Sequence, residues 1–207
     1  MAEAVLERTG AVPSVAMDVL EAIRTRRSVG TVRPEAPSRE TIEAILDAAT
    51  WAPNHRLTEP WRFFVLTGDA RESLGDVMAR SKLAGKEGTP EELQAEYERA
   101  RAKPLRAPVI IAVAVEPATG PKIVEIEEVA AGAAAVQNML LAAHALGLAA
   151  IWRTGDACYD AAVKSYFDLS PASHLLGFVY LGYPAAVSVR SRHTPAAEVT
   201  RWLGWNE

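Results

Sequence analysis

The sequence has a single cysteine, Cys158, which excludes an intramolecular disulfide framework. Long apolar runs are also missing: the runs 129–136 and 145–152 have eight residues each, whereas a membrane-spanning helix needs about 18 or more. Residues 1–16 contain acids, Gly10 and Pro13, and no apolar stretch that reaches the length of a signal peptide. We therefore expect a cytoplasmic protein with no membrane partner.

An excess of positive charge is absent as well. The 22 Lys and Arg residues are outnumbered by 26 Asp and Glu residues, which gives a formal net charge of −4. Such a chain has no bulk attraction for phosphate backbones, so we expect no nucleic-acid partner. The 49% hydrophobic and 23% charged fractions are typical of a globular protein. The length of 207 residues predicts one domain, over residues 17–207, preceded by a flexible extension over residues 1–16.

Motifs of fixed spacing are missing from the chain. It has no G-x-G-x-x-G, Walker A, H-E-x-x-H, G-x-S-x-G or C-x-x-C pattern. The four histidines lack the spacing of metal ligands, so we predict no metal site. Cys158 has no activating neighbour in the sequence, and we interpret it as a small buried residue rather than a nucleophile. No side chain is named as a catalytic acid or base.

Hydrophobic periodicity predicts strands that alternate irregularly with helices, which favours an α+β or an α/β fold. The predicted strands are 61–67, 109–115, 148–152 and 175–182. The predicted helices are 17–27, a segment capped by Ser38 and stopped at Ala52, segments that begin at the capping boxes Asp69 with Glu72 and Thr89 with Glu92, 126–146, and about 157–167. Because the helix at 90–103 has few apolar residues, we interpret it as an exposed cover over a cleft.

Arginines stand at three predicted loop junctions, in the segments 26–28 (RRS), 153–155 (RTG) and 190–192 (RSR). Guanidinium groups suit phosphate and carbonyl groups because they donate two parallel hydrogen bonds and remain charged. The first pair has an alternative role, which is to complement the C-terminus of a helix and is worth about 0.3–1 kcal/mol. The sequence alone leaves both interpretations open for that pair.

Five segments then follow one another in a characteristic order: MDVLEAIRTRRSVG, APNHRLTEPWRFFVL, LRAPVIIAVAV, AAVQNMLLAAHALGLAAIWRTG and GFVYLGYPA. Together they resemble the nitroreductase family of FMN-dependent oxidoreductases, and the small, minimal NAD(P)H nitroreductase branch most closely. The likeness runs from Met17 nearly to the C-terminus. It implies an α+β fold in which helices flank a central, mostly antiparallel sheet, and an interlocked homodimer with FMN at the subunit interface.

The resemblance also implies which residues bind FMN. Segment 26–28 would hold the ribityl phosphate or the pyrimidine edge, residues 152–155 would line the ring and approach N5, and segment 53–55 would reach the FMN of the partner subunit. Two arginines after the last strand would add phosphate contacts. The full set is Arg26, Arg27, Ser28, Pro53, Asn54, His55, Trp152, Arg153, Thr154, Gly155, Arg190 and Arg192.

Two departures from the family pattern bear on this set. Gly30 stands where many relatives have a second basic residue, which puts one phosphate contact in doubt, and Thr154 keeps the hydroxyl of the more common Ser. His55 has an alternative as an ordinary surface-loop residue, and we expect Trp61 to lie in the core. The small-residue stretch 130–135 (AAGAAA) suits close approach of another helix, either at a dimer interface or within one chain.

The activity implied by the resemblance is a ping-pong reaction in which NADH or NADPH reduces FMN at N5 and a nitroaromatic, quinone or activated alkene then accepts the electrons. Arg153 would stabilise the anionic reduced flavin. Two alternatives stay open: an FMN-binding carrier or sensor without nicotinamide turnover, and a flavin-dependent relative of the dehalogenase type.

Overall fold

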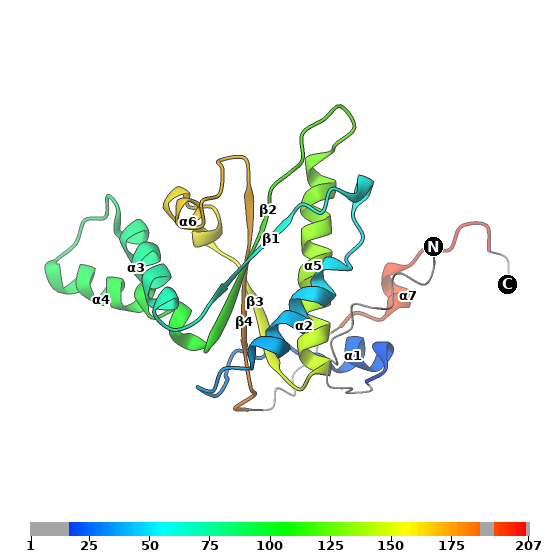
Figure 1. Ribbon diagram of the computed structural model, residues 1–207, viewed down its shortest axis with the longest axis horizontal. Coiled ribbons are helices and arrows are strands. Elements are labelled where there is room, and N and C mark those ends of the chain that lie inside the picture. The colour runs from blue at the N-terminus through cyan, green and yellow to red at the C-terminus, as the bar shows by residue number, and fades with distance from the viewer. Residues whose placement is uncertain (1–16, 187–192, 206–207) are drawn as a thin grey trace.

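A four-stranded antiparallel sheet separates two layers of helices (Figure 1). The computed structural model describes residues 17–186 and 193–205. Its strands are β1 (Trp61–Leu66), β2 (Val109–Val115), β3 (Ala149–Arg153) and β4 (His174–Gly182). They lie in the order β1-β2-β4-β3, and each neighbouring pair is antiparallel, so the fold is α+β as expected.

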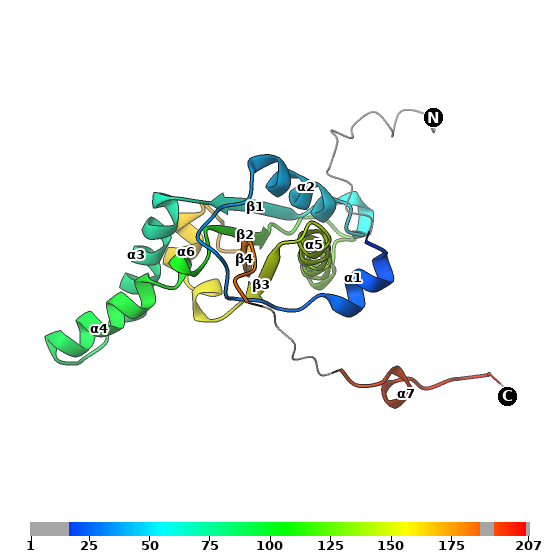
Figure 2. The ribbon, with the colours of Figure 1, turned by 90° about the horizontal axis from the view of Figure 1, so that it is seen from below.

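Helices cover both faces of the sheet (Figure 2). They are α1 (Val19–Thr25), α2 (Arg39–Thr50), α3 (Asp69–Leu83), α4 (Pro90–Arg101), α5 (Glu125–Ala145), α6 (Ala161–Tyr166) and α7 (Ala196–Val199), with short 3₁₀ turns η2 (His55–Leu57), η3 (Pro104–Arg106) and η4 (Asp156–Cys158). Helices α2 and α5 pack on one face, α3 and α6 pack on the other, and α4 lies against α3. Helix α7 lies apart from both layers.

Strand β2 is the centre of the fold, because it pairs with β1 on one side and β4 on the other. All of its residues are buried, as its continuous run of β-branched residues and alanines predicts. Val109, Ile111 and Val113 belong to the core beneath α2 and α5, whereas alternate residues belong to the core beneath α3 and α6. The period of two along a strand thus supplies both cores. Trp61 is buried in the first core, which confirms its predicted place.

Helix α5 approaches the sheet closely at Gly132. A Cβ atom at this position would lie 2.4 Å from Cγ2 of Val115 and 2.6 Å from Cδ1 of Leu176. The small-residue stretch was expected to admit another helix, and α2 does pack against α5, whereas the close neighbour of Gly132 itself is the sheet. Only hydrogen fits between the helix backbone and these two side chains.

One predicted helix starts where expected but without the expected cap, and another predicted helix is interrupted. Asp69 begins α3 but makes no side-chain cap, because the N-cap residue is Gly68 and Glu72 instead accepts a hydrogen bond from Arg101. The helix predicted at about 157–167 is interrupted, because the carboxylate of Asp160 accepts hydrogen bonds from the first backbone N–H groups of α6. Of the two predicted capping boxes, the one at Asp69 is absent, and the one at Thr89, which begins α4, is confirmed.

Some expectations fall on residues that the structure does not describe, and others concern a membrane span or a metal site. Residues 1–16, Arg190 and Arg192 lie outside the described residues. Within residues 17–186 and 193–205, no helix has the length and apolar character to cross a membrane. The same ranges hold no cluster of three or more His, Cys, Asp or Glu side chains arranged for a metal ion.

We predict that Gly132→Val lowers the free energy of unfolding by roughly 1–3 kcal/mol, the usual cost of overpacking a core. Urea titration monitored by circular dichroism measures the change. The matched control is Ala95→Val on the exposed side of α4, where only helix propensity is lost, a cost below about 0.7 kcal/mol. Equal losses in the two variants would contradict the close approach of α5 to the sheet.

Candidate functional site

The segment that follows α1 lies along the outer edge of β3. Ser28 forms a parallel bridge with Ala150, and the N–H of Val29 donates to the carbonyl of Ala150 at 3.1 Å. Further on, the N–H of Arg33 donates to the carbonyl of Tyr183 at 2.8 Å. These backbone bonds bring the RRS segment beside the strand that carries the RTG segment, although more than a hundred residues separate them in the sequence.

A cavity of about 750 Å³ opens beside β3, on the face of the sheet that carries α3 and α6. Residues 151–157 form one wall, and Phe178 and Tyr180 of β4 form its base. The opposite wall comes from the C-terminal half of α3, from the end of α4 and from η3. The predicted ring-binding residues 152–155 therefore line a real cavity. Its volume is that of a small-molecule site.

Two contacts with residues far away in the sequence hold Arg153 in this cavity. Its Cζ atom lies 5.2 Å from the centre of the Tyr180 ring, which is a cation–π contact. A Cβ atom at Gly30 would lie 2.8 Å from Nη2 of Arg153, so the guanidinium fills the space that a side chain at position 30 would take. A cation from another part of the chain thus lies against the backbone at Gly30. The Nε atom of Arg153 is buried and has no hydrogen-bond partner.

The two arginines at the end of α1 differ in their contacts. Arg27 donates from Nη1 to the carbonyls of Arg24 at 2.7 Å and of Arg26 at 2.9 Å, the helix-terminus role that the sequence left open. In contrast, Nη1 of Arg26 is buried without a partner. His144 lies beside them, with Nε2 2.8 Å from Oγ1 of Thr25. Burial and then the charges of Arg26 and Arg27 lower the pKa of His144, which favours its neutral form.

Local geometry also fixes Trp152 and Gly155, two of the residues predicted to line the flavin ring. Trp152 donates from Nε1 to the carbonyl of Leu176 at 3.1 Å, and its indole lies close over Gly177, where a Cβ atom would come within 2.4 Å of Nε1. Gly155 has a φ of 127°, which favours glycine, and the space above its Cα is open. Among the described residues, the N–H groups of Thr154 and Gly155 meet no hydrogen-bond acceptor. Both remain available to a ligand.

Segment 53–55 lies at the opposite end of α5 from the arginines. Nδ1 of His55 lies 3.0 Å from Oε2 of Glu127 near the start of the helix, whereas Arg26 lies near His144 at its end. At a rise of 1.5 Å per residue, Glu127 and His144 are about 25 Å apart along the helix. One chain therefore keeps Pro53, Asn54 and His55 apart from the arginines at the end of α1, and none of the three lines the cavity.

The loop after Pro53 is held in a strained conformation. Three of its residues other than glycine have positive φ: Arg56 (59°), Leu57 (54°) and Glu59 (47°). Asn54 stabilises the loop by accepting from the N–H of Glu59 at 3.1 Å, and the buried carboxylate of Glu128 accepts from the hydroxyl of Thr58 at 2.8 Å. Strain of this kind persists where the surroundings enforce it, and it gathers at functional sites.

The family model described as "Nitroreductase family" matches residues 23–183. This chain belongs to the nitroreductase family. The matched range begins in α1, ends just after β4 and includes every residue that the structure places around the cavity.

Relatives and solved structures extend this assignment. The protein named "Putative NAD(P)H nitroreductase YdjA" from Escherichia coli (strain K12) is 33% identical over 179 residues, which are 86% of this chain and 95% of that protein. A nitroreductase-like family protein from Bacillus cereus has a TM-score of 0.78 at 26% identity, over 94% of this chain and 100% of that one. A nitroreductase with bound FMN from Bacteroides fragilis has a TM-score of 0.67 at 26% identity, over 90% and 100%.

In this nitroreductase, sequence reasoning did not assign Tyr180 to the site and did not predict which group faces Gly30. Tyr180 supports Arg153, and the signal for it was the alternation in β4, where Tyr180 shares a face with Phe178. Gly30 was noted as a departure, but its role depends on a neighbour 123 positions away, for which a single sequence holds no signal. Cys158 is buried as predicted, and burial raises the pKa of its thiol to about 11, which keeps it protonated at neutral pH.

Proposed function

We propose that this protein is an FMN-dependent oxidoreductase that takes electrons from NADH or NADPH and passes them to nitroaromatic, quinone or activated-alkene acceptors. One observation carries the proposal: two buried guanidinium atoms have no partner, Nε of Arg153, which lines the cavity, and Nη1 of Arg26, just before the segment that pairs with the edge of β3. Such donors call for an acceptor from outside the chain, because an unmet buried donor costs about 1–3 kcal/mol. Family membership and the FMN bound to the Bacteroides fragilis relative support the choice of FMN.

The residues present fit the parts of FMN. Its dianionic phosphate requires cations, which Arg26 and its neighbours would supply, joined by Arg190 and Arg192 outside the described residues. Its ring requires a wall with free donors, which Trp152 and the backbone of 154–155 would supply. When bound, FMN supplies hydride transfer at N5, and the protein contributes position and electrostatics. We assign this role to a single domain over residues 17–207.

Arg153 would act as an electrostatic group rather than as an acid or base. Its side chain is fixed between the Tyr180 ring and the backbone at Gly30, so its charge needs no reorganisation when negative charge develops nearby. The cavity also keeps part of this guanidinium away from water, which strengthens its field. A second subunit would complete the site, since segment 53–55 lies about 25 Å along α5 from Arg26.

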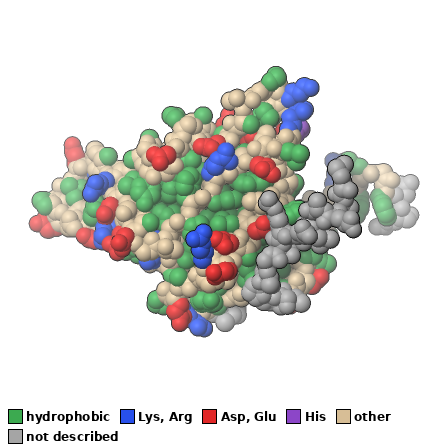
Figure 3. All heavy atoms as spheres, viewed as in Figure 1, with side chains coloured by type: hydrophobic (Ala, Val, Ile, Leu, Met, Phe, Trp, Pro, Cys, Tyr) green, Lys and Arg blue, Asp and Glu red, His purple; other side chains and the backbone are tan. Residues whose placement is uncertain are grey.

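Exposed apolar surface supports a homodimer. Three large residues of α1 are more than half exposed: Val19 (61%), Leu20 (54%) and Ile23 (52%). On α5, Ile126, Ala130 and Gln137 form part of an exposed, largely apolar strip. Figure 3 shows hydrophobic side chains gathered over the middle of one face of the molecule. Exposed apolar side chains on neighbouring helices are typical of an interface between subunits.

The direct test of the activity is anaerobic mixing of the FMN-loaded protein with NADH or NADPH in a stopped-flow spectrometer. We expect either coenzyme to bleach the flavin absorbance, and 4-nitrobenzamide to restore it. A protein that binds FMN but is reduced by neither coenzyme is a carrier or sensor, and that result would overturn the proposal. A protein that binds no FMN would also overturn the proposal, because the activity requires bound FMN.

Removal of the fixed cation tests the role of Arg153. In Arg153→Ala we expect a more negative midpoint potential of bound FMN, because the cation favours the anionic reduced form, and roughly tenfold weaker FMN binding. Spectroelectrochemistry and fluorescence titration measure the two quantities. Arg39→Ala on the exposed side of α2 serves as the control. A midpoint potential that does not change in Arg153→Ala would refute this role.

The homodimer is tested by a charge on the exposed strip of α5. We expect Ala130→Arg to shift the protein from dimer to monomer in light scattering after size-exclusion chromatography, because a buried unpaired charge at an interface costs several kcal/mol. FMN binding should fall with it. Ala95→Arg on the exposed side of α4 should remain dimeric and keep FMN. A dimer that tolerates Ala130→Arg would contradict the proposed interface.

A further inference from the structure

The cavity has a charged wall that the proposed function leaves unused. Opposite residues 151–157, the lining comes from the end of α3, the α3–α4 connection and the segment after α4. The ionisable side chains around the whole cavity are Lys82, Lys86, Lys103, Arg106, Arg153, Asp156 and Asp160. Cations outnumber carboxylates here, although the chain as a whole has a net charge of −4. The cavity therefore concentrates positive charge in an acidic protein.

Part of this charge is already balanced. Lys82 and Lys86 both face Glu96, with Nζ of Lys82 3.6 Å from Oε1, and the hydrogen bond from Lys86 lowers the pKa of Glu96. Asp160 is occupied as the cap of α6, where its Oδ1 atom accepts from two backbone N–H groups. Among the described residues, no carboxylate forms an ion pair with Lys103 or Arg106. These two cations are the unbalanced part of the wall.

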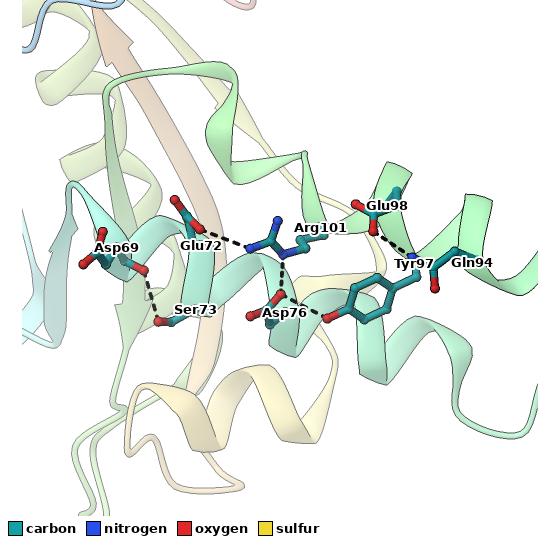
Figure 4. A network of polar contacts seen from close by, with 8 residues as sticks. All are labelled: Asp69, Glu72, Ser73, Asp76, Gln94, Tyr97, Glu98 and Arg101. Carbon is teal, nitrogen blue, oxygen red and sulfur yellow. Dashed lines mark hydrogen bonds and ion pairs between the residues drawn. The ribbon is translucent and has the colours of Figure 1, made fainter.

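The position of these two cations is fixed by a polar network between α3 and α4 (Figure 4). Arg101 donates from Nε to Oδ1 of Asp76 at 2.6 Å and from Nη2 to Oε2 of Glu72 at 3.1 Å, and the hydroxyl of Tyr97 also donates to Asp76 at 3.0 Å. At Gly75 a Cβ atom would lie 2.3 Å from the carbonyl oxygen of Arg101, so the two helices touch there. Helix α4 thus ends at a defined place.

Backbone hydrogen bonds also fix the segment after α4, which forms part of the cavity wall. The N–H of Lys103 donates to the carbonyl of Ala100 at 3.1 Å, and the N–H of Leu105 donates to Ala102 at 3.2 Å. Buried Pro104 anchors the turn between the two cations. Lys103 and Arg106 are therefore presented from one short turn. Helix α4 forms a wall of the cavity in this structure, and its action as a moving cover stays a prediction.

The opposite side of the cavity contributes a further cation. Burial raises the pKa of Tyr180, and the charges of Arg153 and Arg106 oppose this shift, so both guanidinium groups act on the same ring. The lining also includes the apolar side chains of Met78, Ile151 and Phe178. A ligand in this space meets both apolar surface and positive charge. The complementary ligand has a flat apolar body with an acidic group.

We propose that Lys103 and Arg106 bind an anionic group, a carboxylate or a phosphate, on the substrate that enters the cavity. The proposal rests on the proposed function, because the cavity wall formed by residues 152–155 is the one assigned to FMN. Two sources of the anionic group share this chemistry: an acidic electron acceptor, such as an aromatic carboxylate, and the phosphates of the nicotinamide coenzyme. Arginine and lysine both suit these groups, and arginine can donate two parallel hydrogen bonds.

The experiment compares the FMN-loaded wild type with the double variant Lys103→Gln/Arg106→Gln. The acceptors are 4-nitrobenzoate and its neutral counterpart 4-nitrobenzamide. We expect the KM for 4-nitrobenzoate to rise about tenfold or more in the variant while that for 4-nitrobenzamide stays unchanged, because a lost charge-assisted hydrogen bond weakens binding to that degree. The control Arg99→Gln/Lys122→Gln removes the same charges from exposed positions that do not line the cavity.

Separate half-reactions identify the source of the anion. A loss confined to reoxidation by 4-nitrobenzoate assigns the wall to the acceptor. A loss confined to the binding of NADH or NADPH in the reductive half-reaction assigns it to the coenzyme phosphates. Either result supports the proposal, and 0.5 M salt should weaken the same step in the wild type, because exposed charges are screened. Equal effects on charged and neutral acceptors, with no effect on the coenzymes, would overturn it.

Calorimetry separates this proposal from the proposed function. Binding of 4-nitrobenzoate and of inorganic pyrophosphate to the FMN-loaded protein is measured without turnover. In one outcome neither coenzyme reduces the flavin, but one of these anions binds the wild type and does not bind Lys103→Gln/Arg106→Gln. The proposed reaction then fails, and the anion site is supported. If the flavin is reduced but neither anion depends on the two cations, then the anion site fails and the reaction stands.

Discussion

The arrangement of the candidate site depends on the backbone pairing of the segment after α1 with the edge of β3. The hydrogen bond from Val29 to the carbonyl of Ala150, with the bridge at Ser28, determines where the arginines at the end of α1 lie relative to Arg153. Side chains alone do not impose this proximity, because the buried donor atoms of Arg26 and Arg153 have no protein partners. The sheet edge holds two cationic segments together despite their repulsion, at a place where a bound anion would relieve it.

Close approaches at glycine set the positions of the side chains around this edge. Gly30 leaves room for the guanidinium of Arg153, Gly177 leaves room for the indole of Trp152, and Gly132 lets α5 rest on the sheet. In each case the glycine and the group that it admits come from different elements. Two of these groups, the guanidinium of Arg153 and the indole of Trp152, belong to residues that line the cavity, so their positions depend on missing Cβ atoms.

Local signals in the sequence predict much of the fold. The Thr89 capping box, the Ser38 cap and the uninterrupted apolar run of β2 each act within a few residues, so the sequence alone locates these elements. The roles of Gly30 and Arg106 depend on neighbours brought together by the sheet and by the α3–α4 network, and a single sequence does not reveal them. The family resemblance indicated the RRS and RTG segments, and the structure adds that Arg27 already serves the end of α1.

We propose that the RRS segment, residues 152–155 and the 53–55 loop of a second copy surround one flavin, and the rest of the site depends on this arrangement. A crystal structure of the FMN-loaded protein tests this most directly. We expect the FMN phosphate within hydrogen-bonding distance of Arg26, the ring against Trp152 and Thr154, and His55 of the partner subunit at the same flavin. Flavin bound away from the edge of β3, or contacted by one chain alone, would contradict it.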